Sequence, residues 1–178
     1  KTYSSTNNTE YHSYRDSDIE DYIDGVMLLI ERGYFVIRTG KYVNKELNIN
    51  DSNFLDYPNS GLRTDFLDIW LMANCKFCIS SSNGLECISD IFGVPMLFIN
   101  AAPIGHINSW SNDSIWTPKI IVDKNTKRII SLKEQIEKKL VDLSECDRLK
   151  VSYNEFLEST NLEIIDNSKD LIRESFNE

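Results

Sequence analysis

Apolar residues recur at helical spacing in the first well-patterned stretch of the chain, residues 19–30. Apolar positions every three or four residues form one stripe along a helix. Asp16 or Ser17 is a suitable residue to cap the start of this helix, and Gly33 is the residue type expected just after its end. The pattern therefore predicts a helix over 19–30.

Short apolar runs and helical patterns alternate along the next part of the chain. The run at 34–38 is rich in β-branched and aromatic residues, and the run at 94–99 is almost continuously apolar, which is typical of a strand buried on both faces. Strands that alternate with helices predict an α/β fold with a parallel, Rossmann-like sheet covered by helices on both faces. The expected strands are 34–38, 53–57, 76–80 and 94–99, and the expected helices between them are 66–74 and 84–92.

The remainder of the chain has a different pattern. Residues 100–118 contain prolines and tryptophans without a period, so we expect a long loop that is functional or that covers the edge of the sheet. A last strand is expected at 120–122. Beyond it the pattern predicts only helices, which are expected at 131–140, around 153–157 and at 168–176.

These patterns divide the chain into a polar arm at 1–12, an α/β domain at 13–125 and an all-helical C-terminal extension at 126–178. A right-handed crossover joins two parallel strands, yet no strand is predicted before the helix at 19–30. Because the chain also begins at Lys1 rather than at a methionine, we expect a fragment that lacks the first strand of its sheet.

Charge and composition exclude some classes of partner. With a formal net charge of −9, most of the surface would repel a phosphate backbone, so no nucleic-acid partner is expected. The apolar runs are too short for a membrane span, and no signal-peptide pattern opens the chain. The four cysteines indicate a reducing compartment, so we expect a cytoplasmic protein, with Cys75 and Cys78 packed in the core rather than forming a redox or zinc site.

The turn after the strand at 76–80 is the main candidate for a binding site. Ligands of open parallel sheets bind beyond the carboxyl ends of the strands, where helix N-termini offer free backbone N–H groups. Ser81, Ser82, Asn83 and Gly84 follow such an end, and their small side chains leave room for a phosphate to approach the backbone. The turn therefore predicts a diphosphate cradle.

Helix capping is the alternative interpretation of this turn. Ser82 or Asn83 would then only cap the following helix, and Glu86 would complete a capping box with Asn83. Under the binding interpretation, Glu86 is instead a candidate for contact with ribose or sugar hydroxyls.

Charged residues near the same edge form a second set of candidates. Arg38 ends the strand at 34–38, so we expect its guanidinium to bind a phosphate; the alternative is an ion pair with one of the acidic side chains. Arg15 and Arg63 are weaker candidates of the same kind. Asp65 is expected to cap a helix rather than to act as a base, with Thr64 as the other choice of cap.

His106 is the remaining candidate. It lies in the predicted loop at 100–118 and could act as an acid or base, although a lone loop histidine is more often without a chemical role. We expect no metal and no cofactor.

Several ordered segments resemble a family of bacterial glycosyltransferases associated with surface polysaccharides. They lie between residues 12 and 100, and the pair of motifs at 82–84 and 93–95 also resembles the donor-domain signature of many GT-B glycosyltransferases and nucleotide-sugar epimerases. In the family the turn usually reads Ser-Gly, whereas Asn83 stands before Gly84 here. The other segments that carry the resemblance are 14–22, 33–40, 54–57 and 65–68.

The resemblance implies a GT-B donor domain that binds a nucleoside-diphosphate sugar for transfer to a surface glycan. It also implies an N-terminal domain that binds the glycan acceptor and is absent from this chain. Direct displacement without a metal is expected, with Arg38 and the serine-loop amides stabilising the phosphate charge. The alternatives are a nucleotide-sugar epimerase and a non-catalytic, doubly wound binding or regulatory module.

Overall fold

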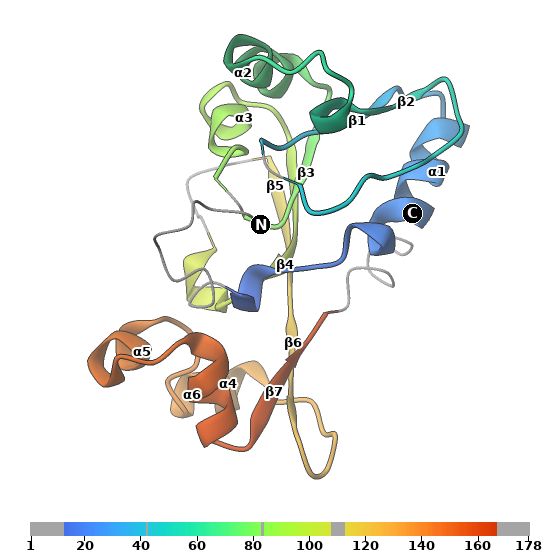
Figure 1. Ribbon diagram of the computed structural model, residues 1–178. Coiled ribbons are helices and arrows are strands. Elements are labelled where there is room, and N and C mark those ends of the chain that lie inside the picture. Colours follow the sequence, from blue (N-terminus) through green and yellow to red (C-terminus); the bar gives the residue numbers. More distant parts are fainter. Residues whose placement is uncertain (1–12, 42, 83, 108–112, 167–178) are drawn as a thin grey trace.

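The computed structural model describes residues 13–41, 43–82, 84–107 and 113–166 of the chain. It is a mixed α/β structure in which parallel strands and their helices lie above a smaller unit with an antiparallel strand pair (Figure 1). The strands of the upper part are β1 (Val36–Arg38), β2 (Phe54–Asp56), β3 (Cys78–Ser80), β4 (Met96–Ala101) and β5 (Ser114–Pro118). Its helices are η2 (Ile19–Tyr22), α1 (Ile23–Glu31), η3 (Tyr57–Asn59), α2 (Asp65–Asn74), α3 (Cys87–Ile91) and η4 (Ile104–His106).

The first predicted helix is confirmed, but its cap is not the predicted residue. The chain enters through the 3-10 turn η2 and continues as α1. Asp18 has an extended backbone and its side chain accepts a hydrogen bond from Glu20 N at 3.0 Å, so Asp18 is the cap. Asp16 and Ser17 lie two residues and one residue before this cap, and the Ser17 hydroxyl is within hydrogen-bond distance of the Tyr22 hydroxyl instead. Gly33 ends the helix with φ +86°, as expected.

The strands of the upper part pair in parallel, as predicted, but in two sheets. β1 pairs with β2, while β3, β4 and β5 form the other sheet in that order. β4 extends to Ala101 and β5 covers Ser114–Pro118, so the prediction of a loop over 100–118 is wrong at both ends of that stretch. The register is held by the side chain of Trp116, whose ring stacks on Phe98 with a centroid distance of 3.7 Å.

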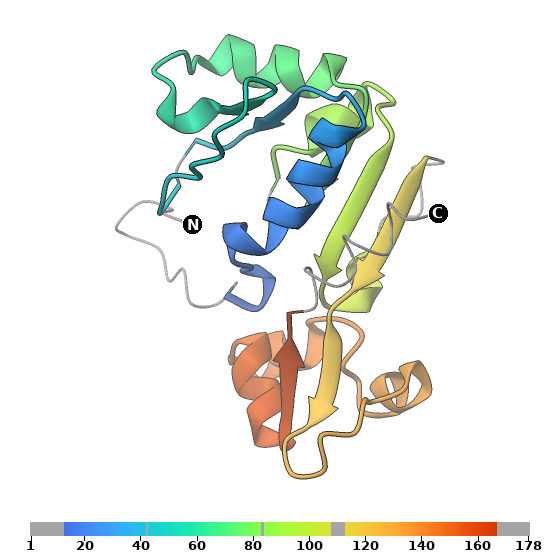
Figure 2. The same cartoon turned by 90° about the vertical axis from the view of Figure 1, so that its right-hand side faces the viewer.

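Helices cover both faces of the β3-β4-β5 sheet, as predicted. Leu97 and Ile99 of β4 face Tyr22, whereas Met96 and Phe98 face Met72 of α2 on the other side. All six residues of β4 are buried, which agrees with its continuous apolar run. Figure 1 shows α1 on one side of these strands and α3 on the other, and Figure 2 shows α1 alongside β4.

The prediction of an all-helical C-terminal extension is wrong. β6 (Ile120–Asp123) pairs in antiparallel register with β7 (Leu162–Ile165), which lies within the predicted extension. β7 was missed because it is only four residues long and directly follows a helix. The helices that pack with this pair are α4 (Leu132–Glu137), α5 (Ser144–Leu149) and α6 (Tyr153–Ser159); the helix predicted at 168–176 lies outside the described residues.

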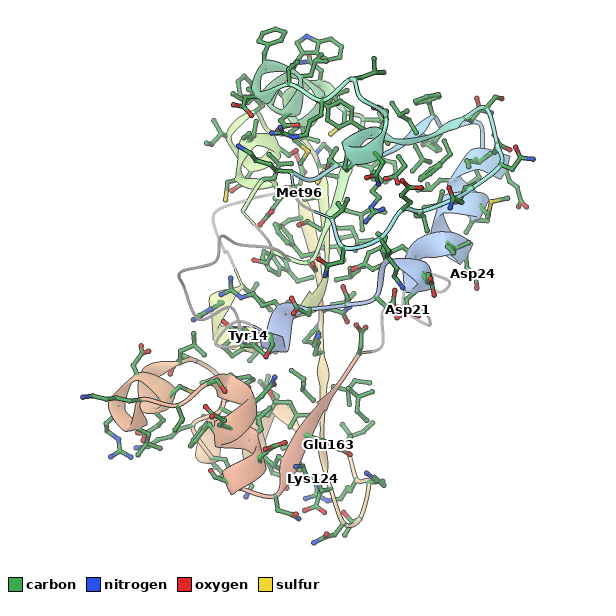
Figure 3. All side chains as sticks on the ribbon, in the orientation of Figure 1. Tyr14, Asp21, Asp24, Met96, Lys124 and Glu163 are labelled. Atoms are coloured by element: carbon green, nitrogen blue, oxygen red, sulfur yellow. The ribbon has the colours of Figure 1, made fainter. Side chains whose placement is uncertain are left out.

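The C-terminal unit has its own core, which also holds part of the N-terminal segment. Leu140, Leu157 and Leu162 are at most 1% exposed and belong to one cluster with Tyr14. The ring of Tyr14 meets that of Tyr153 edge to face at 5.4 Å. Figure 3 shows Tyr14 pointing toward this unit, so the chain just before η2 is anchored on residues far along the sequence.

A capping box on α4 predicts a pH dependence. Arg128 and the Ser131 cap hold the pKa of Glu134 near 2, well below its ordinary value of 4.5, chiefly through hydrogen bonds from Arg128. A carboxyl with a depressed pKa stabilises the fold above its unfolded pKa, and this contribution is lost as the pH falls from about 4.5 toward 2.

We therefore expect Glu134→Gln to flatten the loss of stability between pH 5 and pH 2.5, measured by urea unfolding at several pH values. Arg128→Gln removes the other half of the pair and should flatten the same part of the profile, although less, because the Ser131 hydrogen bonds to Glu134 remain. An unchanged slope in both variants would contradict this role of the pair.

Candidate functional site

A cavity of about 490 Å³ lies at the carboxyl ends of β1 and β3. Its wall combines the segment before η2, the inner face of α1 and the stretch that links β1 to β2. This is the edge at which ligands of open parallel sheets bind. The wall residues from the two strand ends are Arg38, Thr39, Gly40, Ser80 and Ser81.

The cavity wall combines charged and apolar side chains. Arg15, Arg38 and Lys45 bring cationic groups to the wall, together with the carboxylates of Asp16 and Asp18. The apolar residues of the wall come from η2, α1, the strands and the 43–47 stretch, and are Ile19, Val26, Leu29, Val36, Ile37, Val43, Leu47, Phe54 and Ile79. Such a combination suits a ligand with a charged group and a less polar body.

Arg38 lies on the cavity wall, but its charge is paired. Its guanidinium donates to the Asp56 carboxylate at 3.2 Å and to the Lys45 carbonyl at 2.8 Å. The Arg38 side chain is only 11% exposed and that of Asp56 14%. The alternative was a surface ion pair; an ion pair is present, but it is nearly buried, and the phosphate contact stays a prediction.

Asp56 organises this part of the wall. Besides Arg38, its carboxylate accepts hydrogen bonds from the Leu47 backbone N–H at 3.0 Å and from the Asn59 amide at 2.6 Å. Because Leu47 and Lys45 belong to the stretch that lines the cavity, one carboxylate fixes both the arginine and the neighbouring backbone. The sequence analysis did not single out Asp56; its position at the end of a strand, opposite Arg38 in a parallel pair, is the signal that was available.

Arg15 reaches the wall from the N-terminal segment. Its Nε donates to the Tyr14 hydroxyl at 3.1 Å, and its guanidinium carbon lies 5.2 Å from the centroid of the Tyr14 ring. Lys119, which is buried, donates to the Asp16 carbonyl at 2.7 Å and so fixes the next residue. Arg15 and Arg38, which are distant in sequence, are therefore brought to one cavity.

The serine turn is only partly on the cavity. Ser80 and Ser81 line it, whereas Ser82 and Gly84 lie outside its wall, and Asn83 lies outside the described residues. The Ser80 hydroxyl accepts from Ser82 N at 3.1 Å, and Ser82 has a left-handed φ of +59°. These interactions form a tight turn at the end of β3.

The side chain of Glu86 folds back onto the backbone of the same turn. It is 4% exposed, and its carboxylate accepts a hydrogen bond from Gly84 N at 2.7 Å. One of the amides predicted to bind phosphate therefore already has an anionic partner. α3 begins only at Cys87, with Glu86 as its N-cap residue and without a side-chain cap, so the helix is shorter than predicted and the capping box with Asn83 is not described.

A partly buried polar cluster, which the sequence pattern does not reveal, lies next to the cavity. The Tyr22 hydroxyl lies 3.0 Å from the Ser17 hydroxyl, and both residues line the cavity. Burial raises the pKa of Tyr22, while hydrogen bonding by Ser17 and, more weakly, by Ser81 and Asn100 lowers it. Asn100 is fully buried with φ +59°, and neither atom of its amide has good hydrogen-bond geometry with a described residue.

The other predicted site residues lie away from the cavity wall. Thr64, not Asp65, caps α2, since its hydroxyl accepts from Leu67 N at 3.1 Å. Asp65 is exposed, and hydrogen bonding from Arg63 is the main cause that lowers its pKa. His106 lies in η4 and does not line the cavity. Partial burial of its ring, and then the nearby charge of Arg15, lower the pKa of His106.

The cysteine pair has the packing role that was predicted. Cys75 and Cys78 are free thiols that pack with Met72 and Val94 between α2, α3 and the sheet. Burial raises the pKa of Cys78 to about 12, so its thiol is neutral at physiological pH.

Comparison with known proteins yields no relative for this chain. No family model matches it, and no curated protein and no solved structure matches it either. In the part of the chain that the structure describes, no helix is long and apolar enough to cross a membrane. The fold and the site define the class of the protein only broadly, as a mixed α/β protein with parallel sheets and a cavity at their carboxyl edge.

Proposed function

We propose that this domain binds a nucleoside-diphosphate sugar and forms the donor half of a GT-B-type glycosyltransferase. The observation that carries the proposal is the cavity at the carboxyl ends of β1 and β3, with Arg15, Arg38, Ser80 and Ser81 on its wall. Parallel sheets bind nucleotides at this edge. The resemblance of the 12–100 segment to bacterial glycosyltransferases supports the same assignment.

In this proposal the cationic side chains of the cavity wall and the hydroxyls at the end of β3 hold the diphosphate. Arg15 and Arg38 supply positive charge, and the hydroxyls of Ser80 and Ser81 donate hydrogen bonds to phosphate oxygens. The nucleoside packs against apolar side chains of the wall, among them Phe54 and Val26. During transfer the bond between the sugar and the diphosphate breaks, and the two arginines stabilise the charge that develops on the leaving group.

The rest of the proposed enzyme follows from the GT-B architecture. The described sheets would belong to a Rossmann-like donor domain, and the glycan acceptor and the general base would be supplied by an acceptor-side domain. The protein would act in the cytoplasm, where nucleotide sugars are the substrates, and without a bound metal.

We test the proposal by isothermal titration calorimetry of the chain with UDP, GDP, CDP and ADP and with their common sugar conjugates. We expect one nucleoside diphosphate to bind, and Arg15→Ala and Arg38→Ala each to weaken its affinity about 10- to 100-fold, because a hydrogen bond to a charged group contributes roughly 1.5–3 kcal/mol.

Arg128→Ala is the matched control, since it removes an arginine from an ion pair on the C-terminal unit, away from the cavity. It should leave the affinity unchanged. Circular dichroism of each variant separates loss of binding from loss of folding. Failure of every nucleotide to bind the folded wild-type chain would refute the proposal.

A second candidate is a non-catalytic module that binds an uncharged polar ligand. The charges on the wall are largely compensated, because Arg38 pairs with Asp56, and Lys45 pairs with Asp18 at 2.8 Å and Glu20 at 3.0 Å. A neutral ligand would not have to compete for these partners. In the same titrations, binding of a free sugar without affinity for any nucleotide would favour this candidate.

A further inference from the structure

Two neighbouring helices of the upper part turn large apolar side chains to the solvent. On α2, Phe66, Ile69 and Trp70 are 71%, 50% and 50% exposed. On α3 and just after it, Ile91 and Phe92 are 79% and 61% exposed. We call these five residues the α2–α3 surface. Figures 1 and 2 show the two helices packed next to each other on the same side of the sheet.

The pattern on α2 is that of a helix-packing face. Residues at i, i+3 and i+4 lie on one side of a helix, so Phe66, Ile69 and Trp70 form one stripe. The opposite side of α2 already packs against the sheet through Met72, which is 5% exposed. α2 is therefore apolar on both sides, which is typical of a helix that has a partner on each.

The area of this surface is suited to a specific contact. Three aromatic and two aliphatic side chains at these exposures present roughly 500–600 Å² of apolar area, the upper end of what a monomer exposes. If the same surface of a second molecule covers it, the contact buries about 1,000–1,200 Å² in total, near the lower limit of stable interfaces.

The local charge beside the α2–α3 surface does not oppose a second copy of the chain as the occupant. Each chain carries a formal net charge of −9, so two copies can approach only where the local charge is balanced. The acid at the N-terminal end of the stripe, Asp65, is matched by Arg63 at 2.8 Å and Lys41 at 3.9 Å. The same negative charge disfavours an anionic lipid surface as the occupant.

We propose that the protein forms a twofold symmetric dimer through the α2–α3 surface. In such a contact the α2 stripes of the two copies pack on each other, and Ile91 and Phe92 extend the interface to the side. A single patch that is complementary to itself gives a closed dimer rather than a chain of molecules. The cavity at the carboxyl edge has none of the five residues on its wall and stays open in this dimer.

The dimer is tested by sedimentation velocity on the full chain over a range of concentrations. We expect the wild type to convert, as the concentration rises, from a species of 20.6 kDa to one of twice that mass. Phe66→Glu and Trp70→Glu should each raise the dimer dissociation constant at least 10-fold, because each places a charge in the apolar contact. Ile136→Glu, at a residue of α4 that is 57% exposed, is the matched control and should dimerise as the wild type does.

A second measurement does not depend on the glutamate variants. Cys87 is exposed and lies one turn before Ile91 on α3, so alkylation of its thiol should slow as the dimer forms. A wild-type chain that remains monomeric at high concentration, or a dimer that Phe66→Glu and Trp70→Glu leave intact, overturns the proposal and leaves this surface to a different protein.

Discussion

Replacing Ile99 by alanine is expected to lower the free energy of unfolding by about 2–5 kcal/mol, the largest effect that we predict for a single apolar substitution. Ile99 is 0% exposed and lies in the middle of the fully buried β4. Truncation loses the transfer free energy of the Ile99 side chain and leaves a cavity, which the close-packed surroundings fill only in part.

The same substitution should also perturb the wall of the cavity. Ile99 packs with Tyr22 and Ile79, which both line it, so loss of the contact loosens one wall. Urea unfolding with a fluorescence or circular dichroism readout measures the change in stability. Ile115→Ala is the control, because Ile115 is also on a strand of this sheet but is 67% exposed. Its effect should stay within about 0.5 kcal/mol, and similar losses in the two variants would contradict the burial described for β4.

Asp56→Ala is expected to destabilise the protein by about 2–4 kcal/mol, because it leaves a nearly buried guanidinium and two other donors without their acceptor. Those donors are Arg38, the Leu47 backbone N–H and the Asn59 amide. Asp56→Asn keeps one carbonyl oxygen and should lose less.

The exposed Asp65 provides a matched control for Asp56. It also forms ion pairs with cationic side chains, but its side chain is 82% exposed, so solvent already screens those pairs. Asp65→Ala should therefore have a much smaller effect in the same urea titration. Equal losses for Asp56→Ala and Asp65→Ala would show that the Asp56 hydrogen bonds do not fix the cavity wall. If the proposed function is right, Asp56→Asn should also change the nucleotide affinity, because it alters the partner of Arg38.

Local sequence signals were sufficient for the elements with strong patterns. The helix at 19–30 has an apolar stripe and a terminal glycine, and it forms as η2 and α1. β4 was recognised from its continuous apolar run, and Thr64 was one of two predicted caps for α2. These signals act within a few residues, through side-chain periodicity and hydrogen bonds to the nearest backbone, so they can be read without knowing the fold.

β5 and β7 could not be predicted in this way. β5 is five residues long with an irregular burial pattern, and it is a strand because it pairs with β4 and because Trp116 stacks on Phe98. β7 exists through its pairing with β6 across about forty residues of chain. A short strand gains its stability from its neighbours, and the neighbours are not visible in its own residues.

The candidate site likewise has features that follow from the sequence and features that depend on the tertiary structure. The sequence by itself determined that Arg38 and the serine turn lie at strand ends, because parallel strands that alternate with helices end at a common edge. Only the tertiary structure decided which partners they have. Asp56 holds Arg38, and Glu86 occupies the amide of Gly84. Arg15 is brought to the same cavity because Tyr14 is buried in the C-terminal unit. Ion pairs and burial depend on distances between residues far apart in the chain, and those distances are fixed only when the core has packed.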